Sequence, residues 1–409
     1  MAETVTIDEL GHAGDGIFEA DGRRVFVPYA LAGETVEIER ERDNRARLLR
    51  VIAPSAERVE APCRHFGACG GCALQHMESA AYLAWKRDIV RRSFLLHRID
   101  APVEPVVATP PGARRRAIFS AVNLGNRVIL GFHRRSSREI VNVEECPVLS
   151  ADITGALPLI RQIAAAAIRR RKQGRITVLA GNGLDIAVDG AGKLDRGALE
   201  KLGNFGREMS IARLTVDGSE IFVNRRPEIA AGSAMLMPPP AGFVQASAMA
   251  EAAMADAVAE HVGDSAPIVD LFCGAGTFTL RLARKAAVTA VEGAPELLAA
   301  LDMGVRHATG LKPVTTAARD LFANPMSAIE LDRFGAIVFD PPAAGAKAQA
   351  AQIAASQVPR VVAVSCNPAT LARDARILID GGYRLTRVLP IDQFLWSAEI
   401  EAVATFEKG

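Results

Sequence analysis

The chain has 409 residues, of which 49% are apolar and 23% charged, and its formal net charge is +1. This length calls for two or three domains, and the composition is that of a soluble globular protein. No apolar run is long enough to cross a bilayer, and the start, MAETVTIDEL, lacks the pattern of a signal peptide, so we expect a cytoplasmic protein without membrane partners.

Residues 1–55 have the pattern of a small β-barrel. Five short segments, VTIDEL, GIFEA, RRVFVPYA, ETVEIERE and ARLLRVI, are separated by turn residues, which suits an OB-like barrel. Phe18, Phe26 and Tyr29 fall on predicted strands, and the run RERDNRARLLR makes one edge basic. Aromatic and basic residues on such a barrel predict binding to single-stranded RNA.

Residues 56–235 combine helix and strand patterns. A helix is predicted near 78–97, and strands are predicted within 114–134 and 175–190. These elements indicate a central α+β domain. Positive charge is concentrated in this half of the chain, which predicts a basic surface there. The basic runs lie at 40–50, 86–92, 114–116, 133–138 and 169–172.

Four cysteines of the first half are spaced like ligands. Cys63, Cys69 and Cys72 form C-x5-C-x2-C, and Cys146 follows at a distance. Disulfides are not expected in a reducing compartment. Three clustered thiolates and a remote fourth suit a [4Fe-4S] cluster, whereas zinc more often takes two paired C-x-x-C knuckles. We expect the cluster to have a structural role, with zinc and free buried cysteines as the alternatives.

From about residue 243 helix and strand patterns alternate. Residues 243–262 and 277–285 are predicted helices, and PIVDLF, AVTAVE, GAIVF and RVVAVS are predicted buried strands. This βαβ succession predicts a doubly wound sheet in a third domain at 236–409.

Glycines and acidic residues follow these strands. Gly274 and Gly276 lie where the backbone can approach a ligand, and Glu292 ends the next strand, at the place of a ribose-binding carboxylate. Asp320 and Asp340 follow the third and fourth strands. The carboxyl ends of parallel strands meet at one edge, so we expect a nucleotide cofactor there.

Cys366 is delivered to the same edge by the strand VVAVS, just before Asn367-Pro368 starts a helix. Unsatisfied N–H groups and the helix dipole at this point would favour a thiolate. A thiolate beside a methyl donor is what C5 methylation of a pyrimidine requires, because C5 becomes nucleophilic only after addition at C6. A base must then remove the C5 proton, and Glu401, with a pKa raised by burial, is the candidate.

The pattern D-x-F-x-G-x-G followed by D-P-P resembles S-adenosylmethionine-dependent methyltransferases, and the third glycine of a dinucleotide motif is replaced by Thr279. Together with FVQ, SCNPATLARD and the terminal D-x-F…E-x-E, these motifs resemble the RNA (uracil-5-)-methyltransferase family over essentially the whole chain. The resemblance is to its iron-sulfur members with an N-terminal TRAM domain.

The resemblance implies a Rossmann-like methyltransferase domain that uses S-adenosylmethionine. It implies that Cys366 is the nucleophile and that Glu401, rather than Glu399, is the base. The methyl donor would be surrounded by Gln245, Phe272, Gly274, Thr277, Glu292, Asp320 and Asp340, and Cys63, Cys69, Cys72 and Cys146 would hold the [4Fe-4S] cluster.

The chain departs from the family pattern at three places. Ser247 replaces Asn in Q-x-N, Ala343 replaces Arg in D-P-P-R-x-G, and the segment 392–401 reads DQFLWSAEIE where the family has D-M-F-P-x-T-x-H-x-E. These departures affect the target site rather than the nucleophile and the base.

The resemblance favours ribosomal RNA of the 23S type, with a uridine flipped out of an unpaired segment, modified by a monomeric enzyme to 5-methyluridine. Two rivals are an RNA cytosine-C5 methyltransferase, which usually has a second cysteine beside Asp-Pro, and a non-catalytic iron-sulfur RNA-binding protein. Here DPPAAG has no such cysteine.

Overall fold

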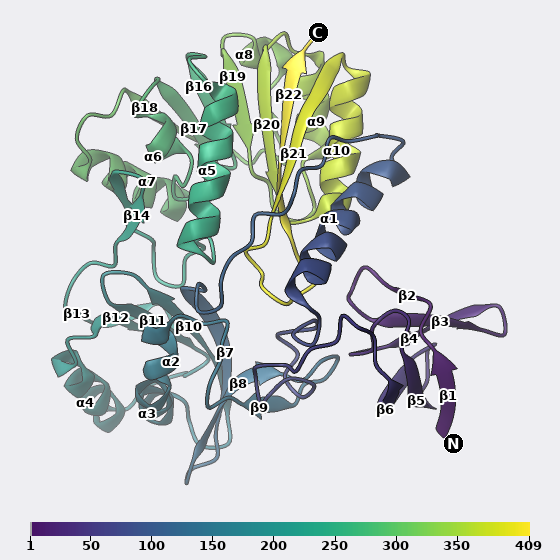
Figure 1. Cartoon of the computed structure of the whole chain (residues 1–409). Helices are drawn as coiled ribbons and strands as arrows, with labels where there is room; N and C mark the ends of the chain where they lie inside the picture. Colours follow the sequence, from purple (N-terminus) through teal and green to yellow (C-terminus); the bar gives the residue numbers. More distant parts are fainter. Residues whose placement is uncertain (1) are drawn as a thin grey trace.

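The computed structural model describes residues 2–409, and Figure 1 shows three parts. An N-terminal barrel-like unit (purple) and a central sheet (blue to teal) lie below a larger C-terminal sheet (green to yellow). Within residues 2–409, no helix is both long and apolar enough to cross a membrane. The predicted α/β architecture is confirmed, and the boundaries near residues 55 and 235 stay predictions.

The N-terminal unit consists of two three-stranded antiparallel sheets, β1-β5-β6 and β2-β3-β4, around one apolar core. Phe18 lies inside this core with 4% of its surface exposed, so its expected role in RNA stacking is wrong. Alternate residues of a strand face opposite sides, and the sequence pattern did not show which side is inside. The strands are β1 (Ala2–Thr6), β2 (Glu9–Leu10), β3 (Gly16–Ala20), β4 (Arg23–Val27), β5 (Thr35–Arg40) and β6 (Ala46–Ala53).

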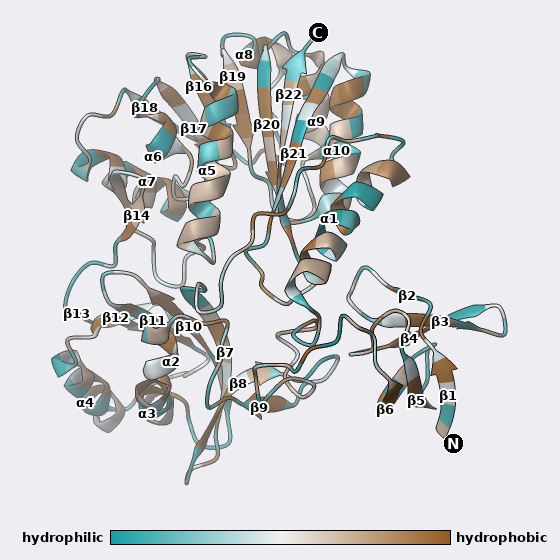
Figure 2. Cartoon of the chain, viewed as in Figure 1, coloured by the Kyte–Doolittle hydropathy of each residue, from teal (hydrophilic) through white to brown (hydrophobic). Residues whose placement is uncertain are grey.

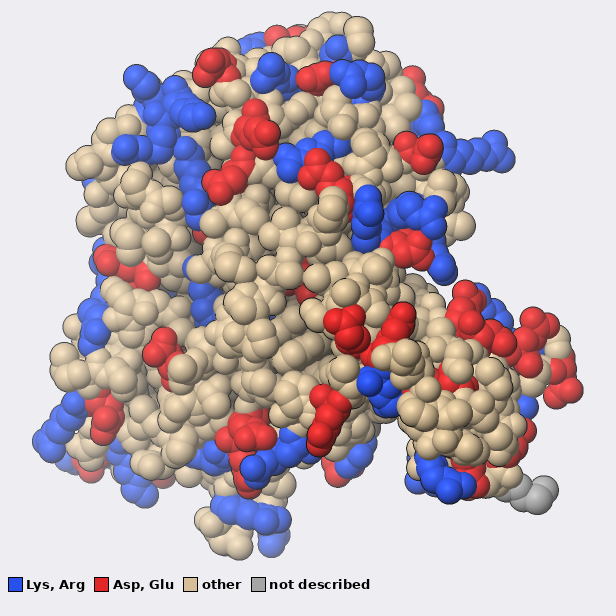
Figure 3. All heavy atoms as spheres, viewed as in Figure 1, with Lys and Arg blue, Asp and Glu red and all other residues tan. Residues whose placement is uncertain are grey.

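The basic run at 40–50 is largely neutralised on the surface of this unit, where Figure 3 shows acidic and basic side chains intermixed. Strand pairing brings arginines of the run next to glutamates: Arg40 pairs with Glu3, Arg47 with Glu39, and Arg50 with Glu37. The expected free basic edge is therefore replaced by a surface of mixed charge.

The central part is a seven-stranded sheet in the order β13-β12-β11-β10-β7-β8-β9. Buried residues of these strands pack on α3, whose Ile160 and Ile163 are fully covered. The strands are β7 (Arg116–Asn123), β8 (Val128–His133), β9 (Ile140–Asn142), β10 (Gln173–Ala180), β11 (Leu184–Asp189), β12 (Ile211–Val216) and β13 (Ser219–Val223). The helices are α2 (Ala151–Gly155), α3 (Leu157–Ala167), α4 (Arg196–Asn204) and the 3-10 turn η1 (Phe205–Arg207).

The C-terminal sheet has the order β18-β17-β16-β19-β20-β22-β21, with β22 antiparallel to both of its neighbours. The first five strands in this order are parallel. Its strands are β16 (Ile268–Leu271), β17 (Val288–Glu292), β18 (Val314–Ala318), β19 (Ala336–Phe339), β20 (Arg360–Ser365), β21 (Tyr383–Ile391) and β22 (Glu401–Lys408). The hairpin β14 (Ile229–Ala231) and β15 (Ala234–Leu236) precedes it.

Helices cover both faces of this sheet, and Figure 2 shows its strands as largely hydrophobic. One face packs on α5, and the other on α9 and α10 together with α1, which comes from the cysteine-bearing part of the chain. Figure 1 shows α1 beside α10. The helices are α1 (Ser79–Leu96), α5 (Ala248–Val262), α6 (Thr279–Leu282), α7 (Pro295–His307), α8 (Ala328–Leu331), α9 (Lys347–Ala355) and α10 (Pro368–Asp380).

The helix predicted at 243–262 begins later than expected. Ser247 caps α5 by accepting a hydrogen bond from the N–H of Ala250, at 3.3 Å. Ala246 and Ser247 instead contact the segment that leads into β7: Ser247 forms an isolated bridge with Arg114, and the Ala246 carbonyl accepts from the N–H of Arg115 at 2.8 Å. The helix predicted at 277–285 is likewise shortened to α6.

Candidate active site and cysteine cavity

The turn after β16 leaves room at the carboxyl edge of the C-terminal sheet. Phe272, Gly274 and Gly276 all have positive φ angles, of 59°, 56° and 100°. A Cβ atom at Gly276 would lie 2.4 Å from Leu301, whereas no atom of the described residues lies within 4 Å of a Cβ built at Gly274. The backbone at Gly274 therefore faces open space, which fits the close approach of a ligand.

Glu292 connects this turn to the end of β17. One carboxylate oxygen accepts a hydrogen bond from the N–H of Gly274 at 3.1 Å, and the other accepts from Gly293 and Ala294 at 2.7 and 3.0 Å. Thr277, partly exposed, lies in the same turn. The two residues predicted to contact the nucleotide thus lie together at the glycine turn.

The loop after β18 brings Asp320 and Phe322 to the same edge. The Asp320 carboxylate accepts a hydrogen bond from the N–H of Phe322 at 2.9 Å. The Phe322 side chain is 52% exposed, and its ring centroid lies 5.3 Å from that of Phe272. A carboxylate and two aromatic rings beside the glycine turn offer both polar and apolar contacts to a nucleoside.

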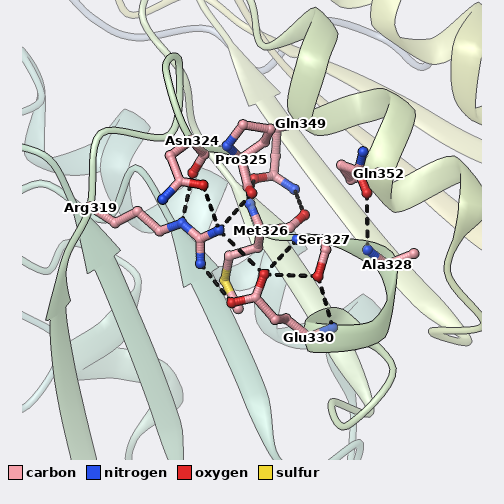
Figure 4. Close-up of polar contacts among 9 residues, drawn as sticks. All are labelled: Arg319, Asn324, Pro325, Met326, Ser327, Ala328, Glu330, Gln349 and Gln352. Carbon is pink, nitrogen blue, oxygen red and sulfur yellow. Dashed lines mark hydrogen bonds and ion pairs between the residues drawn. The ribbon is translucent and has the colours of Figure 1, made fainter.

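Arg319 closes this loop, as Figure 4 shows. Its guanidinium donates to the Pro325 carbonyl at 2.7 Å and to the Glu330 carboxylate at 2.8 Å. Hydrogen bonds from Arg319, followed by those from Ser327, lower the pKa of Glu330 to about 2. On the buried side, the Gln349 amide bonds both the N–H and the carbonyl of Met326, at 2.8 and 3.1 Å. The loop that carries Asp320 is therefore ordered by its own side chains.

Asp270 is a buried acid that sequence reasoning did not single out. It is 0% exposed, and one of its oxygens accepts a hydrogen bond from the Thr279 hydroxyl at 2.6 Å. The other oxygen has no hydrogen-bond partner in the described chain. Burial raises the pKa of Asp270 to about 7. The signal that could have found it is the first position of DLFCGAG, which precedes the glycine turn.

Cys366 lies half-buried at the carboxyl end of β20. The next residue, Asn367, caps α10 by accepting a hydrogen bond from the N–H of Ala369 at 3.0 Å. Burial raises the pKa of the Cys366 thiol to about 11, and the carboxylates of Glu401 and Asp340 raise it further. In the protein without substrate, burial and these two acids thus favour the thiol of Cys366, whereas the helix start by itself predicts a thiolate.

Glu401 starts β22 beside Cys366. The antiparallel register ends with Ser365 opposite Ala402, so Cys366 and Glu401 are the next residues at the same end of the ladder. The Glu401 carboxylate lies close enough to raise the pKa of the Cys366 thiol. Glu401 is 4% exposed, and burial raises its pKa to about 7, as the sequence predicts. Glu399, the other candidate base, is exposed.

The amide of Gln393 fixes the orientation of the Glu401 carboxylate. Its oxygen accepts a hydrogen bond from the N–H of Ala246 at 3.1 Å, so its nitrogen must face the other way. That nitrogen donates to Glu401 Oε1 at 2.7 Å and to Gln245 Oε1 at 2.8 Å. Glu401 Oε2 is buried and has no hydrogen-bond partner among residues 2–409. One carboxylate oxygen is thus held, and the other is left available.

Asp340 joins this group from the end of β19. Burial raises its pKa well above the ordinary value, and the nearby Glu401 carboxylate raises it further. Two acids and a thiol, each with a raised pKa, thus meet at one sheet edge. Such a group of perturbed residues is typical of an active site. Gln245, predicted near the methyl donor, reaches this group through Gln393.

Two departures from the family pattern have local roles here. Ser247 caps α5, as described above, so its hydroxyl is used within the fold. The carbonyl of Ala343 accepts hydrogen bonds from the Asn367 amide at 3.1 Å and the Thr370 hydroxyl at 3.0 Å. The backbone at Ala343 therefore helps to hold the start of α10 next to Cys366.

A groove of about 1090 Å³ opens from Cys366 toward the N-terminal unit. On one side it is lined by Cys366, Asn367 and Ile400, and on the others by residues of α1 and the barrel-like unit, including Trp85 and Phe26. This volume is at the upper end of the range for small-ligand sites, about 300–1,000 Å³. The groove can therefore take a larger ligand than a single nucleoside.

A second cavity, of about 350 Å³, is lined by all four cysteines of the first half. Burial raises the pKa of Cys72 to about 12, and the pKa values of Cys69 and Cys146 are also raised by burial. The guanidinium of Arg114, which lines the same cavity, lies over the Phe394 ring at 5.9 Å. The four residues predicted as metal ligands thus surround one space.

The described residues hold no group of three or more His, Cys, Asp or Glu side chains placed to bind a metal ion. A single ion draws its ligands into one tight shell, whereas a cluster of several irons keeps its thiolates further apart. Each of the four cysteines is a free thiol. Four free thiols that line one cavity are a donor set that fits a thiolate-bound metal group.

Comparison with known proteins gives consistent similarities. Residues 222–408 match the family model described as tRNA (Uracil-5-)-methyltransferase. The chain is 47% identical over 409 residues to an uncharacterized RNA methyltransferase of Mesorhizobium japonicum, covering 100% of this chain and 98% of that protein. It is 33% identical over 419 residues to the 23S rRNA (uracil(1939)-C(5))-methyltransferase RlmD of Edwardsiella ictaluri, covering 99% and 95%.

Among solved structures, the fold is similar to that of the Pyrococcus abyssi tRNA (uracil-54, C5)-methyltransferase, determined in complex with S-adenosyl-L-homocysteine. The TM-score is 0.76 at 20% identity, and the match covers 99% of this chain and 100% of that one. The similarity extends over all three parts of the chain.

Proposed function

Because the chain belongs to the RNA (uracil-5-)-methyltransferase family, we propose that it forms 5-methyluridine through a covalent bond between Cys366 and C6 of a uracil ring. The observation that best supports this is that Cys366 and Glu401 lie near each other where the ladder of β20 and β22 ends, and that Cys366 lines a groove. A nucleophile and a base are then offered to one ring from adjacent strands.

In the first step, the Cys366 thiol loses its proton to water in the groove, and sulfur forms a bond to C6. The electron pair of the C5–C6 double bond moves into an enolate, which makes C5 nucleophilic. The pKa of about 11 means that addition draws on a small thiolate fraction at neutral pH.

Bound at the glycine turn, S-adenosylmethionine would supply an electrophilic methyl group to C5, with the S–CH3 bond breaking and S-adenosylhomocysteine as the leaving group. C5 then carries both a methyl group and a proton. Glu401 Oε2 takes this proton, the C5–C6 double bond forms again, and the Cys366 thiolate leaves C6. The pKa of about 7 lets Glu401 be ionised before this step and protonated after it.

The open backbone at Gly274 and the nearby Glu292 support a donor site at this edge. The Phe272 and Phe322 rings offer an apolar surface for the adenine base. The residues that would surround the donor are Gln245, Phe272, Gly274, Thr277, Glu292, Asp320 and Asp340.

RNA would enter the groove between the barrel-like unit, which we assign as the TRAM domain, and the sheet edge. Trp85 and Phe26 line this groove and provide stacking surfaces for bases of an unpaired segment, from which the target uridine is flipped toward Cys366. The relative named for 23S rRNA, which this chain matches over nearly its full length, favours that substrate over transfer RNA.

We further propose that Cys63, Cys69, Cys72 and Cys146 hold a [4Fe-4S] cluster. The cavity that they line supports this assignment, and Arg114 beside it would offset the negative charge of the thiolates. A cluster there would join the loop after the barrel-like unit to the segment at 146 and stabilise the fold.

Nucleoside analysis tests the reaction and its substrate. The full-length protein is incubated with methyl-labelled S-adenosylmethionine and, separately, with unmodified 23S rRNA and unmodified transfer RNA. We expect labelled 5-methyluridine in 23S rRNA. Label in 5-methylcytidine would identify the cytosine-C5 rival, label in transfer RNA would overturn the substrate, and no label in either would favour a binding protein.

A further inference from the structure

The segment 392–400 joins β21 to β22 and determines how Glu401 is held. Ile391, the last residue of β21, pairs with Glu401, the first residue of β22, so both ends of the segment lie at the reacting edge. Gln393, near its start, donates the hydrogen bond to Glu401 Oε1. Any displacement of this segment would move the amide that orients the carboxylate.

Lys86 reaches this segment from α1, more than three hundred positions away in sequence. Its side chain is 0% exposed although it lies in a run predicted as basic surface. The ammonium group donates to Asp392 Oδ1, to the Phe394 carbonyl at 3.2 Å and to the Glu399 carbonyl at 2.6 Å. An ammonium has three N–H donors, and here each has an acceptor.

These three acceptors lie at both ends of the segment. Asp392 and Phe394 flank Gln393, and Glu399 lies two positions before Glu401. The ion pair of Lys86 with Asp392 is buried on both sides, with exposed side-chain fractions of 0% and 1%. Burying two charges is costly, so this ion pair is weak evidence for a role in stability alone.

The middle of the segment is held from the same helix. The N–H of Trp396 donates to the Tyr82 hydroxyl at 2.7 Å, and the Trp396 carbonyl accepts from the N–H groups of Ala73 and Leu74. Trp396 has a positive φ of 59°, which is rare for a bulky residue and requires support from its surroundings. The whole connection between β21 and β22 is thus fixed by α1 and the turn after Cys72.

We propose that Lys86 is a positioning residue for Glu401, because it clamps both ends of the segment 392–400 and so keeps the Gln393 amide on Glu401 Oε1. With Oε1 held, Oε2 is directed to the proton on C5. This inference rests on the proposed role of Glu401 as the base.

The alternative is that Lys86 only stabilises the fold. Lys86→Met alone would leave the buried Asp392 carboxylate unpaired and could unfold the protein. The double variant Lys86→Met with Asp392→Leu removes both charges and replaces them with apolar groups of similar size, a change that folded proteins often tolerate. Arg91→Met is the matched control, because Arg91 is an exposed basic residue of the same helix.

The experiment follows a single turnover of the full-length protein on a 23S rRNA fragment. It separates the denaturant-resistant RNA–protein adduct from free methylated RNA. If Lys86 acts through Glu401, the double variant forms the adduct but releases product about tenfold more slowly or more. This slowing is part of the roughly 10²- to 10⁴-fold rate enhancement that a positioned base supplies. Arg91→Met should match the wild-type protein.

Release of product at the wild-type rate, or an equal loss of adduct and product, would overturn the inference, since a fold defect slows both. Glu401→Gln is run in parallel to separate the two proposals. If Glu401→Gln accumulates adduct and the double variant does not, the positioning role fails alone. If Glu401→Gln accumulates none, the base assignment fails, and the inference fails with it.

Discussion

Two sites in this chain contain cysteines, and they differ in the charges that surround them. Cys366 lies next to two carboxylates, which raise the pKa of its thiol beyond the effect of burial. The four cysteines of the cavity lie beside one another and the guanidinium of Arg114. In the protein without substrate, burial and the two acids favour the thiol form of Cys366, whereas the cavity gathers the four cysteines that we propose as ligands. The two proposed roles, nucleophile and ligand, thus go with different neighbours of the cysteine.

The largest effect on methyltransferase activity is expected for a change at Cys366 rather than at the cysteine cavity. Cys366→Ala should lower the rate of 5-methyluridine formation at least about 10⁴-fold and abolish the adduct, because no other group can add to C6. Its iron content should remain that of the wild-type protein. Methyl transfer from labelled donor and iron analysis on the same sample check both. Residual methylation within tenfold of wild type would contradict the nucleophile assignment.

Glu401→Gln removes one of the acids next to Cys366 and tests whether that acid is the base that takes the C5 proton. We expect product release to slow by about 10²- to 10⁴-fold, because the C5 proton has no acceptor. The adduct should therefore persist on a denaturing gel. Glu399→Gln is the control, since Glu399 is exposed, and it should release product at close to the wild-type rate.

The rate of adduct formation should rise about tenfold per pH unit between about pH 7 and 9. Below the Cys366 pKa of about 11, each unit increases the thiolate fraction tenfold. Product release should instead level off above the Glu401 pKa of about 7, because the carboxylate is then already ionised. Rapid-quench measurements at each pH give the rate of adduct formation and the rate of product release. A flat profile for adduct formation would mean that Cys366 is already a thiolate.

Cys72→Ser tests whether the cysteines that line the cavity hold an iron-sulfur cluster that stabilises the fold. We expect loss of most of the iron and a lower free energy of unfolding, by about 3–4 kcal/mol if affinity for the cluster falls 100- to 1,000-fold. Anaerobic denaturation of the variant and the wild type, each with and without chelator, measures this. After chelation the two proteins should be equally stable. A variant that is equally destabilised without metal would show a packing defect instead.

The sequence predicted β16, β17, β19 and β20 of the C-terminal sheet because they are short apolar runs followed by glycine, Asp-Pro or Asn-Pro, but it did not predict β21 and β22. Local composition was enough for the strands that were predicted. Phe18 was placed wrongly because alternation along a strand does not tell the inside of a barrel from its outside. The start of α5 was predicted too early because Ala246 and Ser247 contact Arg114 and Arg115, just before β7, and no local pattern reveals a contact so remote in sequence.

The candidate active site was predicted less completely because many of its contacts join residues that are remote in sequence. Cys366 and Glu401 were found from motifs, but the thiol pKa depends on acids brought together only by folding. Lys86 was hidden in a charge run whose neighbours are at the surface, and its partner Asp392 lies at the other end of the chain. Gln393 gave no signal, since an amide is common at surfaces and its two acceptors are remote in sequence.

The hydrogen-bonded register between β20 and β22 determines which side of the sheet Glu401 faces. Six consecutive residue pairs, from Arg360 with Glu407 to Ser365 with Ala402, fix which residue of β22 lies at the end of the ladder next to Cys366. A slip of one residue in β22 would turn Glu401 to the opposite side of the sheet and present Ala402 in its place. A single deletion inside β22 would likewise change which residues face that side. The placement of Glu401 near Cys366 therefore depends on an uninterrupted ladder as well as on the segment 392–400 that precedes it.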